Sequence, residues 1–218
     1  MYSVVEENYL KALLSLANAD DEVSINELSK RLNIKMPTVN SMMKRFAEKE
    51  LVSYESYKPV KLSAKGKKEA SMIIRKHRLT EMFLVEKMDF NWEQVHEIAE
   101  QIEHIQSPLF FEKMDALLGY PKFDPHGSPI PDKNGKVVPT SYVALSACEV
   151  GEMATLKAVS DSSEAFLRFL NGRSILLGDE LQVLSKEAFD GSMQVEVKGK
   201  SAEMFSLLIC EKLLVEKA

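Results

Sequence analysis

Apolar residues recur at helical spacing through the first fifty residues. The segment EENYLKALLSLAN (6–18) predicts an amphipathic helix. Its apolar side carries Tyr9, Leu10, Leu13, Leu14 and Leu16. After the acidic turn at 20–22, INELSKRL predicts a short helix capped by Ser24, with Glu27 as the capping-box partner.

A second helix follows closely. The turn at 33–36 leads to Pro37, a residue favoured in the first turn of a helix, and to TVNSMMKRFAEKE. Two short helices joined by a tight turn predict a helix-turn-helix. LVSYESYKPVKL (51–62) then has strand composition interrupted by a Lys-Pro turn, as in a β-hairpin wing. Residues 1–72 are therefore predicted to form a winged helix-turn-helix.

The pattern changes again from Val143 onward. SYVALSACEVGEMATLKAVSD has strand-turn-strand character, and a helix-like EAFLRFLNGR follows. SILLGDELQVLSK, SMQVEVKG and LLVEKA read as strands separated by Gly or Asp turns. Residues 143–218 are therefore predicted to form a small β-barrel.

Composition supports a globular protein of two or three small domains, with 218 residues and 45% hydrophobic content. No apolar run approaches the roughly twenty residues needed to cross a bilayer, so no membrane association is expected. MYSVVEENYL does not resemble a secretion signal, and a cytoplasmic location is expected. Cys148 and Cys210 form no CxxC pair and are expected to be packing residues.

The net charge of −5 hides an asymmetry. Residues 23–76 hold 13 Lys/Arg and 5 Asp/Glu, whereas the rest holds 15 and 28. A basic stretch on an acidic protein suits a polyanion, because lysine and arginine release counterions from phosphates. The second helix of the pair should read bases in the major groove through Pro37, Thr38, Asn40, Ser41 and Lys44. Phosphates should be contacted by Tyr57, Lys58, Lys61 and Lys65. A winged helix used for protein contacts is the alternative.

All four histidines fall within one fifty-residue span: His77, His96, His104 and His126. In QVHEIAEQIEH, two histidines and two glutamates lie within roughly a 100° arc of one helix. Imidazole and carboxylate on one face suit a divalent first-row metal. The alternative is a solvated helix face. A metalloenzyme would need a catalytic motif such as HExxH, which the chain lacks, so no enzyme is expected.

Three segments resemble the diphtheria-toxin-repressor family of metal-dependent transcriptional repressors: RKHRLTEMFL (75–84), VHEIAEQIEH (95–104) and GYPKFDPHGSPIP (119–131). The resemblance implies a fold that is mainly α with small β parts. It places a helical metal-binding and dimerisation domain at 73–120, a linker carrying metal ligands at 121–142 and an SH3-like (FeoA-like) domain at 143–218. A docking module that supplies no ligand is the alternative for this last domain.

The resemblance also implies two metal sites. The first would use Glu81, Asp124, His126 and Asp161, with Asp124 where closely similar long-form sensors have Cys. A hard carboxylate in place of a thiolate favours Mn²⁺ or Fe²⁺ over Zn²⁺. The second would use His77, Glu100, Glu103 and His104 with Asn8, and His96 would support a site by hydrogen bonding. Asn8 matches neither the iron nor the manganese sensors, and Lys11 replaces a glutamate that some short-form manganese sensors use. The second site is therefore expected either to be weak or to be completed by Glu7 or a water.

These expectations combine into one function: a homodimeric repressor of metal-uptake genes, with Mn(II) or Fe(II) as corepressor. Paired winged helices on a two-fold dimer predict a palindromic double-stranded operator. A winged-helix regulator that responds to a non-metal signal remains the alternative, with a metalloenzyme behind it.

Overall fold

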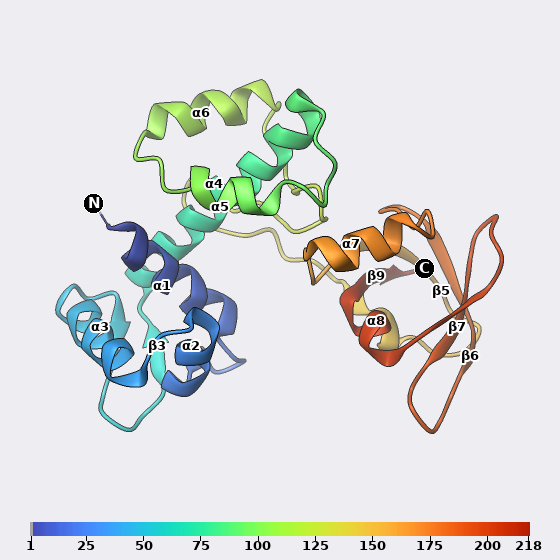
Figure 1. The fold of residues 1–218 in the computed structure, drawn as a ribbon, viewed down its shortest axis with the longest axis horizontal. Coiled ribbons are helices and arrows are strands. Elements are labelled where there is room, and N and C mark those ends of the chain that lie inside the picture. Colours follow the sequence, from blue (N-terminus) through green and yellow to red (C-terminus); the bar gives the residue numbers. More distant parts are fainter. Residues whose placement is uncertain (1) are drawn as a thin grey trace. The chain divides into compact units, whose positions relative to one another are not determined.

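The computed structural model describes residues 2–218, which form two compact units (Figure 1). The first unit comprises the chain up to Thr80 together with 100–119 and 130–138. The second unit comprises 81–99, 120–129 and 139–218. Helix α4 (Ala64–Met88) begins in the first unit and ends in the second.

The first unit contains the predicted winged helix. Its three-stranded antiparallel sheet has the order β1-β3-β2, with Val23 opposite Val60 and Val52 opposite Leu62. In chain order its elements are α1 (Val4–Leu16), β1 (Glu22–Val23), α2 (Ile25–Leu32), α3 (Met36–Glu48), β2 (Val52–Ser53) and β3 (Val60–Leu62). The short strand β1 lies partly in what the sequence suggested was an acidic turn.

Local signals explain these boundaries. Both α1 and α2 begin with a complete capping box, Ser3 with Glu6 and Ser24 with Glu27, so the predicted cap of α2 is confirmed. Asn33 ends α2 in the left-handed conformation with φ 53°. The three helices bury one apolar core, in which Tyr9 and Phe46 meet edge to face at 6.2 Å.

Helix α6 (Pro108–Leu117) and the segment 130–138 also belong to the first unit. Arg75 of α4 donates one hydrogen bond to the Pro131 carbonyl at 2.6 Å and another to the Asp115 carboxylate. One partly buried guanidinium therefore ties α4 to α6 and to the segment 130–138. Helix α5 (His96–Ile102) begins in the second unit and ends in the first.

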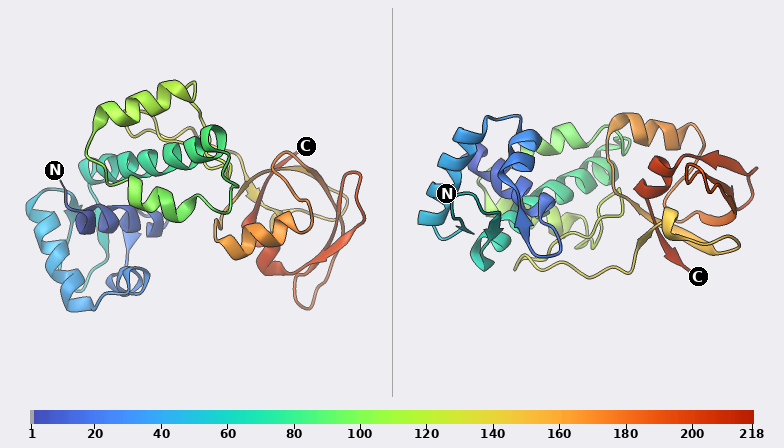
Figure 2. Two further views of the ribbon diagram at one scale, coloured as in Figure 1. Left: turned by 45° about the horizontal axis from the view of Figure 1, so that its top comes forward. Right: turned by 90° about the horizontal axis from the view of Figure 1, so that it is seen from below.

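The second unit is built on a six-stranded antiparallel sheet with the order β4-β9-β5-β6-β7-β8. Its strands, drawn from yellow through orange to red, curve around a common interior in Figure 2. The elements are β4 (Val143–Ala144), the 3₁₀ turn η1 (Leu145–Ala147), β5 (Met153–Val159), α7 (Glu164–Asn171), β6 (Glu180–Lys186), β7 (Met193–Val197), β8 (Glu203–Phe205), α8 (Leu207–Lys212) and β9 (Leu213–Lys217). The predicted small barrel is confirmed, with β8 and α8 added.

Alternating burial fills this barrel. Leu156, Val183, Val195 and Val215 point inward from neighbouring strands and are fully or almost fully buried. Cys148 and Cys210 join the same core, as expected of packing residues, and burial raises the pKa of the Cys210 thiol to about 11. Within residues 2–218, no helix is long and apolar enough to cross a membrane.

Candidate metal centre

Glu81, Asp124 and His126 form a buried cluster in the second unit. Each offers a ligand atom, and these atoms all lie within 4.8 Å of one another. Glu81 comes from α4, and the other two come from the loop at 120–129. The residues are 2%, 6% and 3% exposed. Three of the four predicted first-site residues are therefore together.

The loop holds its two ligands through backbone hydrogen bonds. Asp124 Oδ1 accepts the N–H groups of His126 and Ser128, both at 2.9 Å, so the turn itself orients the carboxylate. The His126 carbonyl accepts the Val159 N–H of β5 at 3.0 Å. Between these contacts Gly127 has φ 83°, and a Cβ there would lie 2.0 Å from the Lys157 carbonyl oxygen. The close approach of the loop to β5 requires glycine.

Trp92 orients the imidazole of His126. Its backbone carbonyl accepts a hydrogen bond from His126 Nε2 at 2.8 Å, and its indole stacks on the imidazole with centroids 5.9 Å apart and planes 25° apart. The Nε2 proton leaves Nδ1 as the nitrogen with a lone pair. Nδ1 lies 3.6 Å from Glu81 Oε2, on the side where the carboxylates converge. The sequence did not mark Trp92 as part of this site.

The electrostatics of the cluster favour a cation. Burial lowers the pKa of His126, but the carboxylates of Glu81 and Asp124 raise it, and the net shift is upward. Charges that stabilise an added proton on the ring also stabilise a divalent ion. Two carboxylates and one imidazole are the donors that Mn²⁺ and Fe²⁺ accept, so the residues present fit such a metal.

Asp161 and His96 lie outside this cluster. Asp161 accepts hydrogen bonds from Lys212 Nζ and from the Ser163 N–H at 2.8 Å. Burial raises the pKa of Asp161, but these hydrogen bonds together lower it by more, so the net shift of the pKa is downward. His96 Nδ1 lies 3.4 Å from Glu81 Oε1, and its side chain is 43% exposed. Its role at the site stays a prediction.

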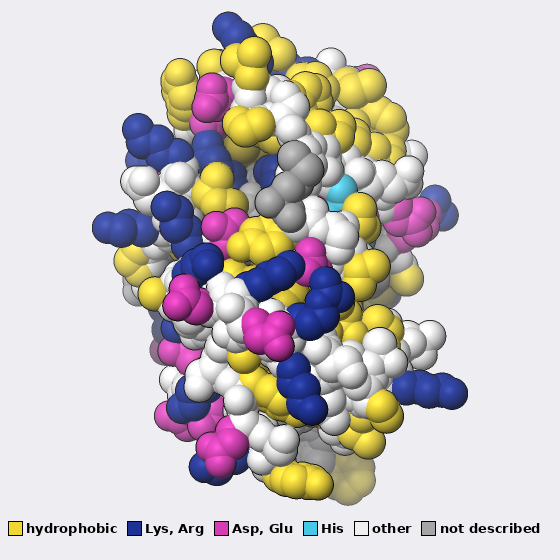
Figure 3. All heavy atoms as spheres, turned by 90° about the vertical axis from the view of Figure 1, so that its left-hand side faces the viewer, with side chains coloured by type: hydrophobic (Ala, Val, Ile, Leu, Met, Phe, Trp, Pro, Cys, Tyr) yellow, Lys and Arg dark blue, Asp and Glu magenta, His cyan; other side chains and the backbone are white. Residues whose placement is uncertain are grey.

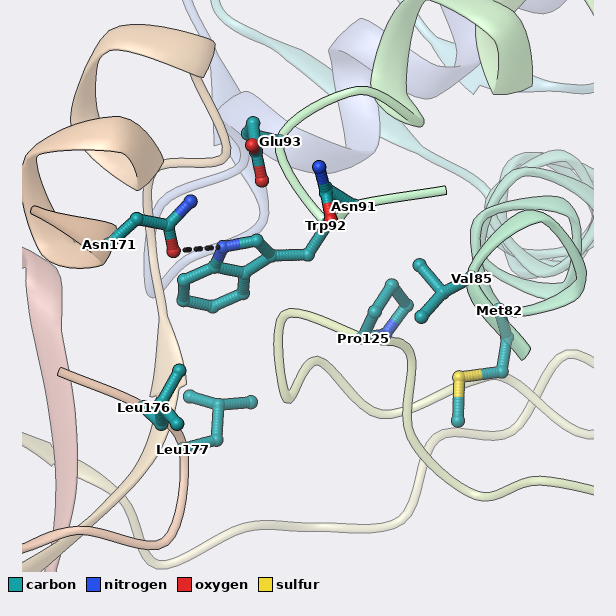
Figure 4. A pocket seen from close by; sticks show the side chains of 9 residues that line it. All are labelled: Met82, Val85, Asn91, Trp92, Glu93, Pro125, Asn171, Leu176 and Leu177. Carbon is teal, nitrogen blue, oxygen red and sulfur yellow. Dashed lines mark hydrogen bonds between the residues drawn. The ribbon is translucent and has the colours of Figure 1, made fainter. Parts of the chain in front are cut away.

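A pocket of about 520 Å³ opens beside the cluster (Figure 4). Its wall includes Trp92, which stacks on His126, and Pro125, which lies between Asp124 and His126 in the chain. Leu176 and Leu177 from the barrel complete this wall. The Trp92 Nε1–H donates a hydrogen bond to Asn171 Oδ1 at 2.8 Å. This bond ties the indole to the end of α7, so the barrel helps to position Trp92.

The second predicted site also has a cluster, in the first unit. Ligand atoms of His77, Glu100 and Glu103 lie within 4.8 Å of one another, and His77 Nδ1 is 2.6 Å from Glu103 Oε2. The Lys11 ammonium lies among them, 2.8 Å from Glu103 Oε2 and 3.2 Å from His77 Nδ1, and it is hydrogen-bonded to Glu100 Oε1. The ammonium therefore lies among the same atoms that a metal ion at this site would use.

The other two residues predicted for the second site are not in this group of three, although His104 Nε2 lies 3.7 Å from Glu103 Oε1. His104 Nδ1 is 2.5 Å from Glu7 Oε2 of α1, and Gln106 donates to the other oxygen of the same carboxylate at 2.9 Å. The Asn8 side-chain oxygen is buried and has no hydrogen-bond partner within residues 2–218. Its role as a ligand therefore stays a prediction.

The predicted DNA-contacting residues lie mostly on the surface of the first unit. Thr38, Ser41 and Lys44 are exposed on α3, whereas Asn40 is half-buried and accepts a hydrogen bond from the Tyr54 hydroxyl at 3.1 Å. Pro37 lies exposed in the first turn of α3, and Ser41 Oγ donates to its carbonyl at 3.0 Å.

The wing between β2 and β3 carries the remaining predicted contacts. Tyr57 is fully exposed and has φ 67°. Lys58 pairs with Glu55 at 2.8 Å and Lys61 with Glu22 at 3.0 Å, both as exposed ion pairs. Figure 3 shows Lys and Arg side chains mixed with acidic ones on one face of the molecule. Exposed pairs of this kind are weak, so both lysines can turn toward phosphates.

Three comparisons place this geometry among known proteins. Family profiles match residues 1–60 (iron dependent repressor, N-terminal DNA binding domain), 63–132 (iron dependent repressor, metal binding and dimerisation domain) and 143–217 (FeoA domain). The diphtheria toxin repressor of Corynebacterium jeikeium is 31% identical over 125 residues, 57% of this chain and 52% of that protein. The match therefore spans about half the length of that curated relative.

Two further similarities cover almost all of the other protein. An HTH-type transcriptional regulator of Methanocaldococcus jannaschii is 33% identical over 51% of this chain and 90% of its own length. A solved structure of a manganese-dependent transcriptional repressor in complex with manganese is 30% identical, with a TM-score of 0.90 over 98% of this chain and 100% of that chain. The fold of each unit thus has a solved counterpart.

Proposed function

Because this chain belongs to the iron-dependent repressor family, we propose that it is a metal-dependent DNA-binding repressor with Mn(II) or Fe(II) as corepressor. The observation that carries the proposal is the buried cluster of Glu81, Asp124 and His126. Its hard oxygen donors and one imidazole suit these two ions. The similarity to a manganese-dependent repressor supports the same reading.

The ligands explain how a metal would change the protein. Glu81 belongs to a long helix, whereas Asp124 and His126 belong to a loop that is hydrogen-bonded to β5. A bound divalent cation would supply the positive charge that lets the two buried carboxylates stay close together. Without that charge, Glu81 and Asp124 repel each other and loosen the loop from α4. If the state with correctly spaced recognition helices binds the metal more tightly than other states do, metal binding raises the population of that state.

The DNA-binding surface is α3 with its exposed Thr38, Ser41 and Lys44. Two copies would read a palindromic operator of metal-uptake genes in the cytoplasm. The dimer would form on the helical region, where α6 leaves apolar side chains exposed: Leu109 is 62% and Leu117 is 61% exposed. The family profile over 63–132 is described as a dimerisation domain, which agrees with this surface.

The test is DNA binding under controlled metal. An operator selected from random duplexes would be titrated by fluorescence anisotropy with apo protein and with Mn²⁺, anaerobic Fe²⁺, Zn²⁺ or Co²⁺. We expect tight binding with Mn²⁺ or Fe²⁺ only, and loss of the response in Glu81→Gln and His126→Ala. Lys133→Met, at an exposed position outside the basic segment 23–76, is the control for general effects of substitution. Equal operator binding by chelated and metal-loaded protein would refute the proposal.

A further inference from the structure

We propose that the Lys11 ammonium permanently takes the place of a metal ion in the cluster of His77, Glu100 and Glu103, so that each chain binds one regulatory metal ion rather than two. The regulatory role of the single metal ion rests on the proposed function. The number of metal ions bound per chain does not, because it concerns binding alone.

The geometry of Lys11 is that of a bound cation. Its Nζ is hydrogen-bonded to Glu100 and Glu103 and lies 3.2 Å from His77 Nδ1. These are the same three residues whose ligand atoms converge within 4.8 Å. An ammonium carries three donors, and two carboxylate oxygens accept from it here, one from Glu100 and one from Glu103.

Burial of the cluster stabilises the ammonium in this position. The Glu103 side chain is fully buried and that of His77 is 8% exposed, while the Lys11 side chain is 21% exposed. A buried carboxylate requires a partner of opposite charge, and removal of that partner is costly. Lys11 supplies the partner from within the chain, so the cluster is neutralised without any ion from solution.

The ammonium and a metal ion exclude each other. Small divalent metal ions bind nitrogen and oxygen donors at about 2.0 to 2.2 Å. An ion held by the three ligand atoms would therefore occupy the space where Nζ lies, 2.8 Å from Glu103 Oε2. Two cations at that range also repel each other. A second metal ion can enter only if Lys11 leaves.

The same face of α1 carries a second tie, one helical turn earlier. Glu7 lies 2.5 Å from His104 Nδ1 and 3.5 Å from Lys76 Nζ. With Lys11, this pairing holds α1 to α4 and to the segment 100–106 when no metal is present. In the proposed repressor, the position of α1 is then independent of metal, and the metal response depends on Glu81, Asp124 and His126 alone.

The experiment counts metal ions per chain by elemental analysis after equilibrium dialysis against Mn²⁺, in the wild type and five variants. We expect about one ion in the wild type, two in Lys11→Met, none in His126→Ala and one in the double variant, as mutual exclusion at one site requires. Lys30→Met is the matched lysine control and should equal the wild type. Lys11→Glu should also bind two, because it adds a carboxylate to the cluster.

Two outcomes would overturn the proposal: two ions in the wild type, or one in both Lys11 variants when circular dichroism shows them folded. The wild type and His126→Ala test it even if the Lys11 variants do not fold. Failure of the first metal site looks different. In that case the wild type binds none, while Lys11→Met still binds one.

Discussion

The indole of Trp92 stacks on the imidazole of His126, with ring centroids 5.9 Å apart, while the Trp92 carbonyl accepts the His126 Nε2 proton. Trp92 is the one tryptophan of the chain. Its fluorescence is therefore expected to report on occupation of the cluster beside it. A hydrogen bond from the second ring nitrogen of a ligating histidine to a carbonyl fixes the orientation and the tautomer of the ring.

Mn²⁺ is paramagnetic and should quench this fluorescence when it binds beside His126. We expect quenching that saturates at one equivalent and is reversed by a chelator. His126→Ala should abolish it, whereas His104→Ala should leave it unchanged because His104 pairs with Glu7 in the other unit. Quenching that persists in His126→Ala would show that the ion binds elsewhere.

Asp124 should set the metal preference. Asp124→Cys places a soft thiolate where the turn now holds a carboxylate. We expect the affinity for Zn²⁺ relative to Mn²⁺ to rise by about tenfold or more, a usual scale for changes at metal sites. Competition titrations with a chromophoric chelator would measure both affinities, and Asp124→Asn would show the effect of charge loss alone. An unchanged ratio in Asp124→Cys would remove Asp124 from the ligands.

Much of the fold follows from local sequence signals. The Ser24 capping box and Pro37 mark the starts of two helices, and alternation marks most strands of the barrel. Three elements were missed, β1, β8 and α8, and two of them for identifiable reasons. The α8 segment LLICEK is apolar and six residues long, so its periodicity cannot be separated from that of the strand that follows. The strand β1 is two residues long and exists only through its pairing with β3.

The site was less predictable than the fold. Glu81, Asp124 and His126 were grouped through resemblance, and the structure brings them together. The role of Lys11 could not be read from the sequence, because its partners lie 66 to 92 residues further along the chain. Asp161 had the right residue type but is paired with Lys212, which arrives from α8, an element that the sequence did not reveal.

Gly127 should be essential to the ligand loop. Gly127→Ala combines an unfavourable φ of 83° with a Cβ only 2.0 Å from the Lys157 carbonyl oxygen, so the loop must move away from β5. We expect a loss of about 1 to 3 kcal/mol in the free energy of unfolding and weaker Mn²⁺ binding. Gly151→Ala is the matched control, with φ 88° and no atom within 4 Å of the added Cβ. Equal effects in the two variants would mean that backbone strain alone is responsible.

Substitutions in α3 and in the wing should distinguish the reading of bases from the binding of phosphates. Asn40→Ala is expected to reduce discrimination at one base position by about 1 to 3 kcal/mol. Lys58→Ala, at an exposed predicted phosphate contact of the wing, should weaken binding to all sequences and lower the salt dependence by about one phosphate contact. Binding to an operator and to single-base variants at several salt concentrations would measure both. A uniform loss in Asn40→Ala would instead assign Asn40 to support of the helix through Tyr54.

Glu6 should make the winged helix sensitive to acid. Its carboxylate lies 2.5 Å from Nζ of Lys49, the residue that follows α3. The same carboxylate accepts a hydrogen bond from the Ser3 N–H at 3.0 Å. The Lys49 contact and then the Ser3 hydrogen bond lower the pKa of Glu6 below its usual 4.5, against the opposing effect of burial. The folded state therefore favours the ionised form. This contribution is complete above the unfolded pKa and is lost as the pH falls through the folded pKa.

Glu6→Gln should accordingly reduce the free energy of unfolding by about 1 to 2 kcal/mol at pH 7. The difference from the wild type should shrink below pH 4.5, where protonation removes the same charge from the wild-type side chain. Urea denaturation of both apo proteins across this range would measure it. Glu48→Gln, at an exposed position of α3, is the control and should show no such convergence. A constant difference between Glu6→Gln and the wild type at all pH values would mean that shape and hydrogen bonding, rather than the Glu6 charge, hold α1 to Lys49.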